Sequence, residues 1–133
     1  MLAITSKSPY ALRALAELAR VGGPAPVPIG EIARRRNIPV QFLEGMFATL
    51  RRAGILQSQR GVKGGYSFAR PPEEITVLDI VEALEGTLTT DAVSDDRVWT
   101  EGIDALREKL RGTTVAQVAE REAREAGAAM YYI

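Results

Sequence analysis

Cysteine and histidine are both absent from this chain of 133 residues. Without cysteine the chain has no disulfide, no thiolate metal site, no cysteine-ligated cluster and no cysteine nucleophile. Without histidine it lacks the commonest general base and the side chain that titrates nearest to neutral pH. The two absences argue against a hydrolase or a transition-metal enzyme, and we expect no catalytic residue, no metal and no cofactor.

Long hydrophobic runs are missing as well. No apolar stretch approaches the roughly 18 residues that a membrane-spanning helix requires. The opening residues, MLAITSKSPY, do not place a charged segment ahead of an apolar one, as a secretory signal does. We therefore expect a cytoplasmic protein without a membrane partner, built as one domain or as a small domain with an appendage.

The formal net charge is zero, but the two halves of the chain carry opposite charge. Residues 1–70 contain eleven Lys and Arg against three acids, which gives a net charge of +8. Residues 71–133 contain six Lys and Arg against fourteen acids, which gives a net charge of −8. This polarity predicts a basic face for a polyanion and a separate acidic part, and the alternative is chance clustering on solvated helices.

The spacing of apolar residues predicts a series of amphipathic helices. Ser8 is the expected N-cap of the first, with Pro9 in its first turn. Capping boxes are expected at Thr76–Asp79 and at Thr114–Gln117. Read from such starts and from glycine stops, the expected helical ranges are 8–22, 29–36, 39–54, 76–86, 97–110 and 114–127.

The helices over 29–36 and 39–54 are joined by Asn37-Ile38-Pro39, which is a helix-turn-helix pattern that other small helical proteins also show. Two strand-like runs follow at once, ILQSQR (55–60) and YSFA (66–69), with GVKGG between them. A helix-turn-helix followed by a β-hairpin is the layout of a winged helix. The expected fold is mainly α: a winged helix-turn-helix with a two-stranded β wing, and a helical dimerisation segment.

The stretch GVKGGYSFARPPEEIT, residues 61–76, also raises the possibility of nucleotide binding. A P-loop needs G-x-x-x-x-G-K-[ST] ahead of a helix, and a dinucleotide site needs G-x-G-x-x-G opening a helix. Here the lysine precedes the glycine pair, and a strand-like run follows. The pattern therefore favours a wing that approaches the DNA backbone over a nucleotide-binding enzyme.

A winged helix presents the first turn of its second motif helix to the major groove. That places Val40, Gln41 and Glu44 near base edges, where Gln pairs with adenine, Glu accepts from cytosine and Val touches a thymine methyl. The other candidates for DNA contact are Lys7, Ser8 and Tyr10 at the start of the first helix, Arg51, and Arg60, Lys63, Gly64, Gly65 and Tyr66 of the wing. Tyr66 either bonds a phosphate or packs on the core, and Arg34–Arg36 either bind phosphate or form a solvated helix end.

Three blocks of the chain resemble successive blocks of the Rrf2 family of bacterial winged-helix transcription regulators, which includes IscR, NsrR and CymR. They are KSPYALRALAELA (7–19), IGEIARRRNIPVQFLEGMFATLRRAGIL (29–56) and SQRGVKGGYSFARPPEEITVLDIVEALEG (58–86), and the resemblance runs over about residues 1–86. The resemblance implies a homodimer that binds a partly palindromic operator and usually represses. It implies a DNA-binding domain over 1–86, and a dimerisation helix and C-terminal tail over 87–133, with the dimer contact on residues 97–111.

By matching position, the resemblance makes Arg60 the minor-groove arginine of the wing and places Gln41 and Glu44 on the recognition helix. Many members bind an iron–sulfur cluster through three cysteines, but the matching segment here, TLTTDAVSDDRVW, has none. The chain resembles the cluster-free, CymR-like branch, in which a small molecule or a protein supplies the signal. The KSP before Tyr10 also departs from the lysine-glycine-arginine usual in the family.

Two other interpretations remain at this stage. The chain is alternatively a protein-interaction module on the same scaffold, with weak or lost DNA binding and the acidic half as its working surface. A small enzyme would have to rely on Asp, Glu, Lys or Tyr, and no paired carboxylates flank a pocket motif. Trp99, the apolar tail and the segment over 87–97 are expected either to line a ligand pocket or to form interface core.

Overall fold

The computed structural model of the chain describes residues 4–88 and 97–131, and most of these residues are helical. The two strands pair antiparallel, with Leu56 opposite Phe68 and Gln59 opposite Gly65. A mainly α fold with a small two-stranded sheet is therefore confirmed. In chain order the elements are α1 (Lys7–Val21), α2 (Ile29–Arg36), α3 (Val40–Arg52), β1 (Leu56–Gln59), β2 (Gly65–Phe68), the short 3-10 helix η1 (Pro72–Glu74), α4 (Val77–Glu85), α5 (Arg97–Arg111) and α6 (Val115–Tyr131).

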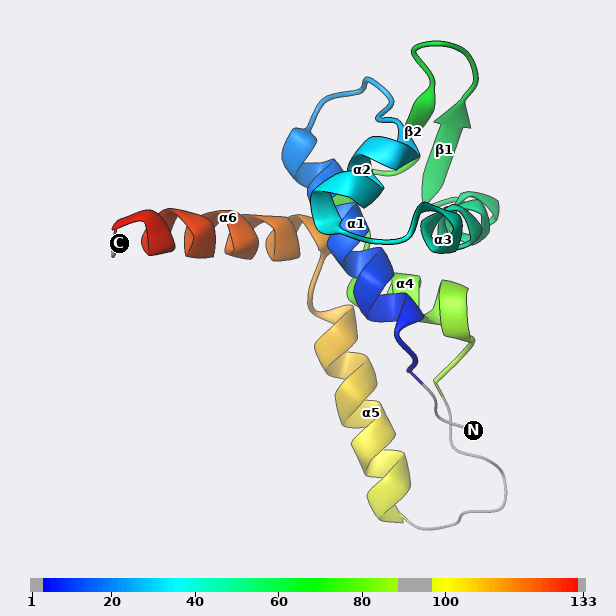
Figure 1. The fold of residues 1–133 in the computed structure, drawn as a ribbon. Coiled ribbons are helices and arrows are strands. Elements are labelled where there is room, and N and C mark those ends of the chain that lie inside the picture. Colours follow the sequence, from blue (N-terminus) through cyan, green and yellow to red (C-terminus); the bar gives the residue numbers. More distant parts are fainter. Residues whose placement is uncertain (1–3, 89–96, 132–133) are drawn as a thin grey trace.

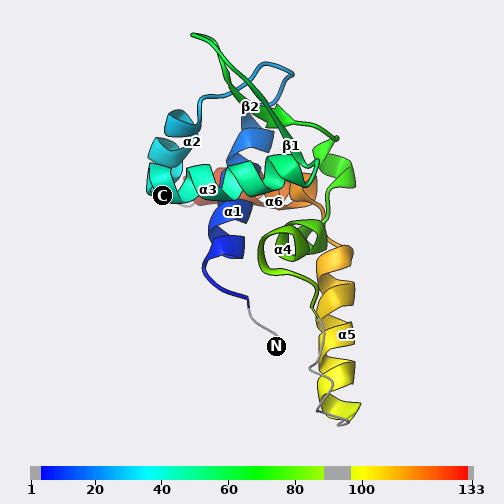
Figure 2. The same cartoon turned by 90° about the vertical axis from the view of Figure 1, so that its right-hand side faces the viewer.

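The arrangement places α1 at the centre of the body, with α2 and α3 beside it (Figure 1). The β1–β2 hairpin projects from the top of the body, α5 runs downward from it and α6 runs to the left. Figure 2 shows the hairpin and α5 pointing in opposite directions. The hairpin, α5 and α6 therefore extend from the body in three different directions.

Both predicted capping boxes are present. At α4 the N–H of Asp79 donates to Thr76 Oγ1, and the N–H of Thr76 donates to the Asp79 carboxylate, each over 3.0 Å. At α6 the N–H of Gln117 donates to Thr114 Oγ1 over 3.1 Å, and the N–H of Thr114 donates to Gln117 Oε1 over 2.9 Å. Both helices start where the residues at their first turns predict.

The two helix starts also lie side by side. Thr76 and Thr114 face each other in an isolated antiparallel bridge. The N–H of Val77 donates to the Thr113 carbonyl over 2.8 Å, and the N–H of Val115 donates to the Ile75 carbonyl over 2.9 Å. This pairing attaches the C-terminal segment to the chain that follows the hairpin.

Two helix ends differ from the prediction. Helix α1 begins at Lys7 with Ser6 at the N-cap position, so Ser8 lies inside the helix and is not its cap. Helix α6 continues through Gly127 to Tyr131. An interior glycine destabilises a helix by only about 1 kcal/mol, and the alanines beside Gly127 are the strongest helix formers, so the glycine does not end the helix.

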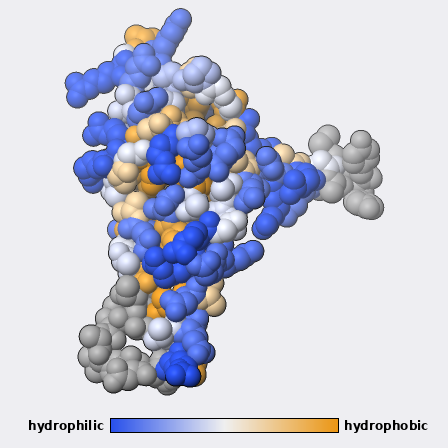
Figure 3. All heavy atoms as spheres, turned by 180° about the vertical axis from the view of Figure 1, so that it is seen from behind, coloured by the Kyte–Doolittle hydropathy of each residue, from blue (hydrophilic) through white to orange (hydrophobic). Residues whose placement is uncertain are grey.

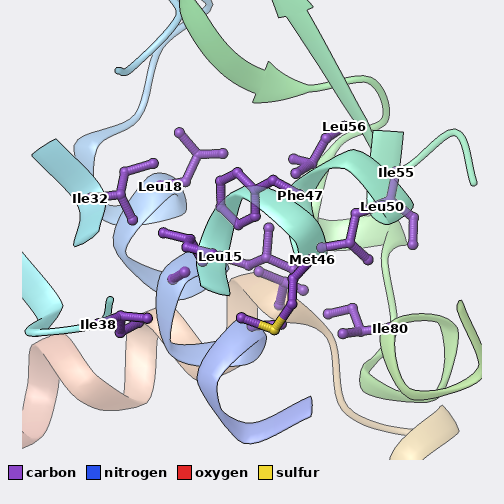
Figure 4. Packing of buried hydrophobic residues seen from close by; sticks show 14 of the residues in the cluster. Leu15, Leu18, Ile32, Ile38, Met46, Phe47, Leu50, Ile55, Leu56 and Ile80 are labelled. Carbon is purple, nitrogen blue, oxygen red and sulfur yellow. The ribbon is translucent and has the colours of Figure 1, made fainter. Parts of the chain in front are cut away.

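The main core lies between α1, α2, α3 and the hairpin, and Figure 4 shows the side chains of Leu15, Phe47 and Ile80 pointing into it. Helix α3 supplies an apolar stripe at helical spacing, as predicted: Leu43, Met46, Phe47 and Leu50. Val115 of α6 is fully buried in the same cluster. The C-terminal segment therefore shares a core with the part of the chain predicted to bind DNA.

A second, smaller cluster joins α4 to α5. Its buried members are Val77, Leu78, Val81, Leu88 and Ile103, and Leu106 and Leu110 of α5 pack against them. Viewed from behind, hydrophobic atoms reach the surface over the lower body beside α5, whereas the described part of α6 is mainly hydrophilic (Figure 3). None of the helices within the described ranges is long and apolar enough to cross a lipid bilayer.

Candidate DNA interface

The turn between α2 and α3 is built from local signals. Asn37 adopts the left-handed conformation, with φ 54° and ψ 50°, and ends α2. Ile38 is 4% exposed, and its N–H donates to the Ala33 carbonyl over 2.9 Å, which anchors the turn in the core. Pro39 then precedes α3 in an extended conformation that suits the start of a helix. The helix-turn-helix is confirmed, and its geometry is held by burial of Ile38.

The outward side of α3 carries the residues predicted to read bases. Val40 is 40% exposed, and Gln41, Glu44 and Arg51 are also exposed. Gln41 lies opposite the buried stripe of α3, whereas Val40, Glu44 and Arg51 lie along the exposed border of that stripe, three to seven positions from buried Phe47. A guanidinium N–H of Arg51 donates to Ser58 Oγ on β1 over 3.5 Å, which links this surface to the hairpin.

The hairpin of β1, β2 and the connecting residues 60–64, which we call the wing, presents basic residues near its tip. Arg60 and Lys63 are exposed, and Val62 between them is fully exposed. The N–H of Gly64 donates to the Gly61 carbonyl over 3.0 Å and closes the tip as a tight turn. The structure therefore brings two of the predicted cations to the end of a projecting hairpin.

Gly64 and Gly65 of the wing lie where the neighbouring backbone leaves no room for a side chain. A Cβ atom added to Gly64 would lie 2.2 Å from the Gln59 carbonyl oxygen. A Cβ added to Gly65, whose φ is +154°, would lie 2.3 Å from the carbonyl carbon and oxygen of Val27. Both separations are far inside van der Waals contact. Gly64 and Gly65 thus permit the hairpin to close and to pack, whatever contact they make with phosphate.

Tyr66 attaches the wing to the body. Its N–H and carbonyl each bond the backbone of Val27 over 2.9 Å, and its ring meets Phe47 edge-on with centroids 5.1 Å apart. The side chain is half-buried. Of the two roles left open for Tyr66, packing on the core is the one that these contacts supply.

The start of α1, where a phosphate contact is predicted, uses two of its three candidate side chains in contacts within the chain. Among Lys7, Ser8 and Tyr10 only Lys7 is exposed. Ser8 is 5% exposed, and its hydroxyl donates to Glu85 over 2.5 Å. Tyr10 packs edge-on against Phe42 of α3, with centroids 5.6 Å apart. The side chains of Ser8 and Tyr10 therefore position the start of α1, and contact of this helix start with a phosphate stays a prediction.

A carboxylate already lies at this helix start. Glu85, the last residue of α4, accepts the N–H of Thr5 over 2.6 Å in addition to the Ser8 hydroxyl. Burial by itself would raise the pKa of Glu85, but the hydrogen bonds from Ser8 and Thr5 and the charge of Lys7 outweigh it, so the pKa lies below the ordinary value of 4.5. The negative charge suits the positive end of the helix dipole of α1, where a phosphate was expected.

The arginines that end α2 do not form a free basic cluster. Arg36 is bonded to Glu17 of α1 over 2.9 Å and to Glu122 of α6 over 2.6 Å. Arg35 is bonded to Glu31 within α2 over 2.7 Å and to Glu17 of α1 over 3.3 Å. The bond to Glu122 is the largest influence on Arg36 and raises its pKa above the ordinary value. Arg35 and Arg36 therefore hold helices together, and Arg34 remains exposed.

The sequence does not predict the roles of Glu85 and Glu122, because no local pattern connects these carboxylates to Ser8 and Arg36. Glu122 is 86 positions from Arg36, and Glu85 is 77 positions from Ser8. Trp99, on α5, is 62% exposed, and the other parts of the suggested ligand pocket, the C-terminal tail and the segment 89–96, lie outside the residues whose side chains the structure describes.

Comparison with known proteins shows which family and which relatives this chain resembles. The sequence model of the Rrf2 family, described as an iron-dependent transcriptional regulator, matches residues 4–121. The HTH-type transcriptional regulator CymR of Bacillus subtilis (strain 168) is 35% identical, over 98% of this chain and 99% of CymR. Protein rrf2 of Nitratidesulfovibrio vulgaris is 33% identical, over 86% of this chain and 85% of that protein.

Solved structures agree with the sequence comparison. The structure of CymR (YrzC), the global cysteine regulator of B. subtilis, superposes with a TM-score of 0.82 at 35% identity, over 91% of this chain and 98% of that one. T. potens IscR superposes with a TM-score of 0.79 at 37% identity, over 94% of this chain and 90% of that one. The winged-helix fold is therefore common to this chain and both regulators.

The iron named in the family description does not fit the residues of this chain. The full sequence contains no cysteine and no histidine, which are the ligands that iron–sulfur clusters use. Within residues 4–88 and 97–131, carboxylates do not gather in a group of three that would hold a metal ion. No chemical role is therefore assigned to iron here.

Proposed function

This chain belongs to the Rrf2 family of DNA-binding transcriptional regulators, and we propose that it binds an operator as a homodimer, with α3 in the major groove and the wing over the neighbouring backbone. One observation carries the proposal. The exposed side of α3, with Val40, Gln41 and Glu44, lies beside a projecting hairpin that bears the exposed cations Arg60 and Lys63. One face of a duplex presents base edges in the groove beside backbone phosphates. The side chains of α3 suit the base edges, and the cations of the wing suit the phosphates.

The proposed roles follow from side-chain chemistry. Gln41 pairs with an adenine, Glu44 accepts from a cytosine amino group, and Val40 contacts a thymine methyl. Arg60 enters the minor groove beyond the wing. Lys7, Arg51 and Lys63 contact phosphates and make the affinity dependent on salt. Ser8, Tyr10, Gly64, Gly65 and Tyr66 support the interface by positioning α1 and the wing.

The proposed dimer forms through residues 87–133, and residues 1–86 bind DNA. Helix α5 supports this division because Val98 and Trp99 are 67% and 62% exposed, although both are large and apolar. A two-fold axis through α5 presents two copies of α3 to half-sites one helical turn apart. Trp99 is the single tryptophan, so its fluorescence reports burial on dimerisation directly.

We further propose that the regulator is a cytoplasmic repressor without an enzymatic activity or an iron–sulfur cluster. Occupation of an operator by a dimer excludes other proteins from the same DNA, which is the simplest route to repression. In this proposal, a small molecule or a protein effector binds the regulator and supplies the signal. The absence of thiolate and imidazole ligands from the sequence supports sensing without a cluster.

The test is selection of bound duplexes from a random pool, followed by titration of the selected site at fixed salt. A partly palindromic sequence is the expected result. Arg60→Ala is expected to weaken binding by at least about 1 kcal/mol with the fold intact. The matched control is Arg124→Ala, which removes an exposed arginine from α6 and leaves the affinity unchanged.

A retention assay at low salt, together with this titration, decides between the proposal and its rival. If the protein is retained by neither heparin nor duplex DNA at low salt, the interaction-module alternative replaces DNA binding. If DNA is bound but Arg60→Ala has the affinity of the wild type, the assignment of the wing is wrong and that of α3 stands. Loss of binding by Arg124→Ala would place the interface on the acidic half.

A further inference from the structure

The outward side of α3 contains a glycine that the packing of the chain does not require. Gly45 lies in the middle of the helix, and a Cβ atom added to it would have no heavy atom within 4 Å. An interior glycine destabilises a helix by about 1 kcal/mol relative to alanine. Gly64 and Gly65 differ in this respect, because a Cβ at either would collide with backbone. The chain itself therefore offers no reason for glycine at position 45.

Gly45 lines a hollow of about 300 Å³ between α3, the start of α1 and the end of α4. Apart from Gly45, the hollow is lined by Lys7, Gln41, Phe42, Met46, Thr49 and Leu84. Gln41, Gly45 and Thr49 are spaced by four residues, so they form one row along the helix. Thr49 directs its hydroxyl at the Gly45 carbonyl, over 3.2 Å. An alanine at position 45 would project from the centre of this row.

The chemistry of the hollow is graded from apolar to cationic. Phe42, Met46 and Leu84 are buried or half-buried, whereas Lys7 and Gln41 are exposed. A strand of DNA has the matching composition, with an anionic phosphate beside an apolar sugar and a polar base edge. The exposed lysine gives an anion a partner that a purely apolar ligand would not use. A DNA strand therefore fits this site better than an apolar small molecule.

We propose that Gly45 is a positioning residue for DNA: its missing side chain lets one strand enter the hollow, so that Gln41 reaches a base edge and Lys7 reaches the adjacent phosphate. This inference rests on the proposed placement of α3 in the major groove. It adds to that placement a steric limit on how closely the helix approaches the duplex. Side chains at position 45 weaken binding in order of size, although they stabilise the helix.

The experiment compares Gly45→Ala and Gly45→Leu with the control Gly127→Ala. Gly127 is also an interior helix glycine with no heavy atom within 4 Å of an added Cβ, and it lies in α6, away from α3. Both alanine variants are expected to raise the melting temperature, because alanine is the better helix former. On the duplex selected by the wild type, Gly127→Ala retains its affinity. Gly45→Ala binds more weakly, and Gly45→Leu binds at least about tenfold more weakly, a change of about 1.4 kcal/mol.

Two outcomes separate this inference from the proposed function. If the wild type binds no duplex, the proposed function fails and the inference fails with it. If the wild type binds and Gly45→Leu, folded by circular dichroism, binds as tightly, the inference alone is overturned. Equal losses on selected and unrelated duplexes support entry of the backbone, and a loss confined to the selected duplex supports entry of a base edge.

Discussion

Gly65 is the residue at which the wing depends most on the absence of a side chain. Its backbone passes Val27 so closely that a Cβ would lie 2.3 Å from the carbonyl oxygen, and its φ of +154° disfavours other residues. The bridge between Val27 and Tyr66 requires that approach, because both of its hydrogen bonds are 2.9 Å long. The base of the wing is therefore fixed by contact between two backbones.

From this contact we predict that Gly65→Ala destabilises the protein by about 1–3 kcal/mol, because the wing or the Val27 segment has to move. Chemical denaturation measures the change. The control is Gly30→Ala in α2, where an added Cβ has open space and alanine favours the helix, so its stability stays the same or rises. If Gly65→Ala were as stable as the wild type, the backbones of Gly65 and Val27 would have to lie farther apart than in this structure.

Glu17 is the residue through which stability depends on acid. Burial by itself would raise the pKa of Glu17, but hydrogen bonds from Arg36 and Arg35 and the charge of Arg36 outweigh it and lower the pKa below 4.5. The folded state therefore binds a proton at this carboxylate less readily than the unfolded state does. The contribution of Glu17 is complete above 4.5 and is lost as the pH falls through the lowered pKa of the folded state.

We predict that Glu17→Gln is less stable than the wild type at neutral pH, and that the difference shrinks as the pH falls below 4.5. Protonated Glu17 and glutamine are both neutral, so the two proteins converge in acid. Urea denaturation across this pH range checks the prediction. Glu125→Gln, which alters an exposed carboxylate of α6, serves as control and is expected to follow the wild type. A difference that does not vary with pH would mean that the charge of Glu17 contributes nothing.

At the scale of elements, the starts of α4 and α6 act as one structure. Each start has a capping box, and the capping residues Thr76 and Thr114 face each other in an antiparallel bridge. Two helices separated by α5 in the chain therefore begin at the same place in the fold. The start of α6 is therefore held against the start of α4 by contacts within a single chain.

We predict that Thr76→Ala and Thr114→Ala each reduce the free energy of unfolding by about 1 kcal/mol, as loss of a cap does. Because the two sites adjoin, the double variant should differ from the sum of the single effects by about 0.5 kcal/mol or more. Thr87→Ala, at an exposed position after α4, changes stability by less than about 0.5 kcal/mol. Strict additivity in denaturation experiments would show that the two starts are independent.

At the scale of the whole molecule, the opposite charges of the two halves meet at a few contacts and are otherwise separate. Arg36 joins Glu122 of α6 over 2.6 Å, and Arg70 approaches Asp79 of α4 at 3.8 Å. These pairs place carboxylates of the acidic half beside Arg36 and Arg70. Arg51, Arg60 and Lys63 stay exposed around α3 and the wing, so a chain of zero net charge keeps a cationic face.

We predict that affinity for the selected duplex falls steeply with added salt. Lys63→Gln is expected to lower the slope of log affinity against log salt by about one unit, because one phosphate contact is lost. Lys109→Gln removes an exposed lysine of the same kind from α5 and leaves the slope unchanged. An equal change of slope in both variants would mean that only total charge matters.

The sequence by itself determined the helix-turn-helix, the hairpin after it, both capping boxes and the apolar stripe of α3. These features depend on residues a few positions apart in the chain, so they can be recognised without knowing any tertiary contact. It also determined the charge polarity and the lack of thiolate ligands, which are matters of composition.

Only the tertiary structure decided what Ser8, Arg36, Gly65 and Tyr66 do. Ser8 looks like a helix cap in the sequence, yet its hydroxyl binds Glu85, 77 positions away. Arg36 looks like a phosphate contact or a solvated helix end, yet it binds Glu122, 86 positions away. Gly65 and Tyr66 face Val27 and Phe47 from another part of the chain. Each of these roles requires a partner that folding alone brings within contact distance, so no local pattern records it.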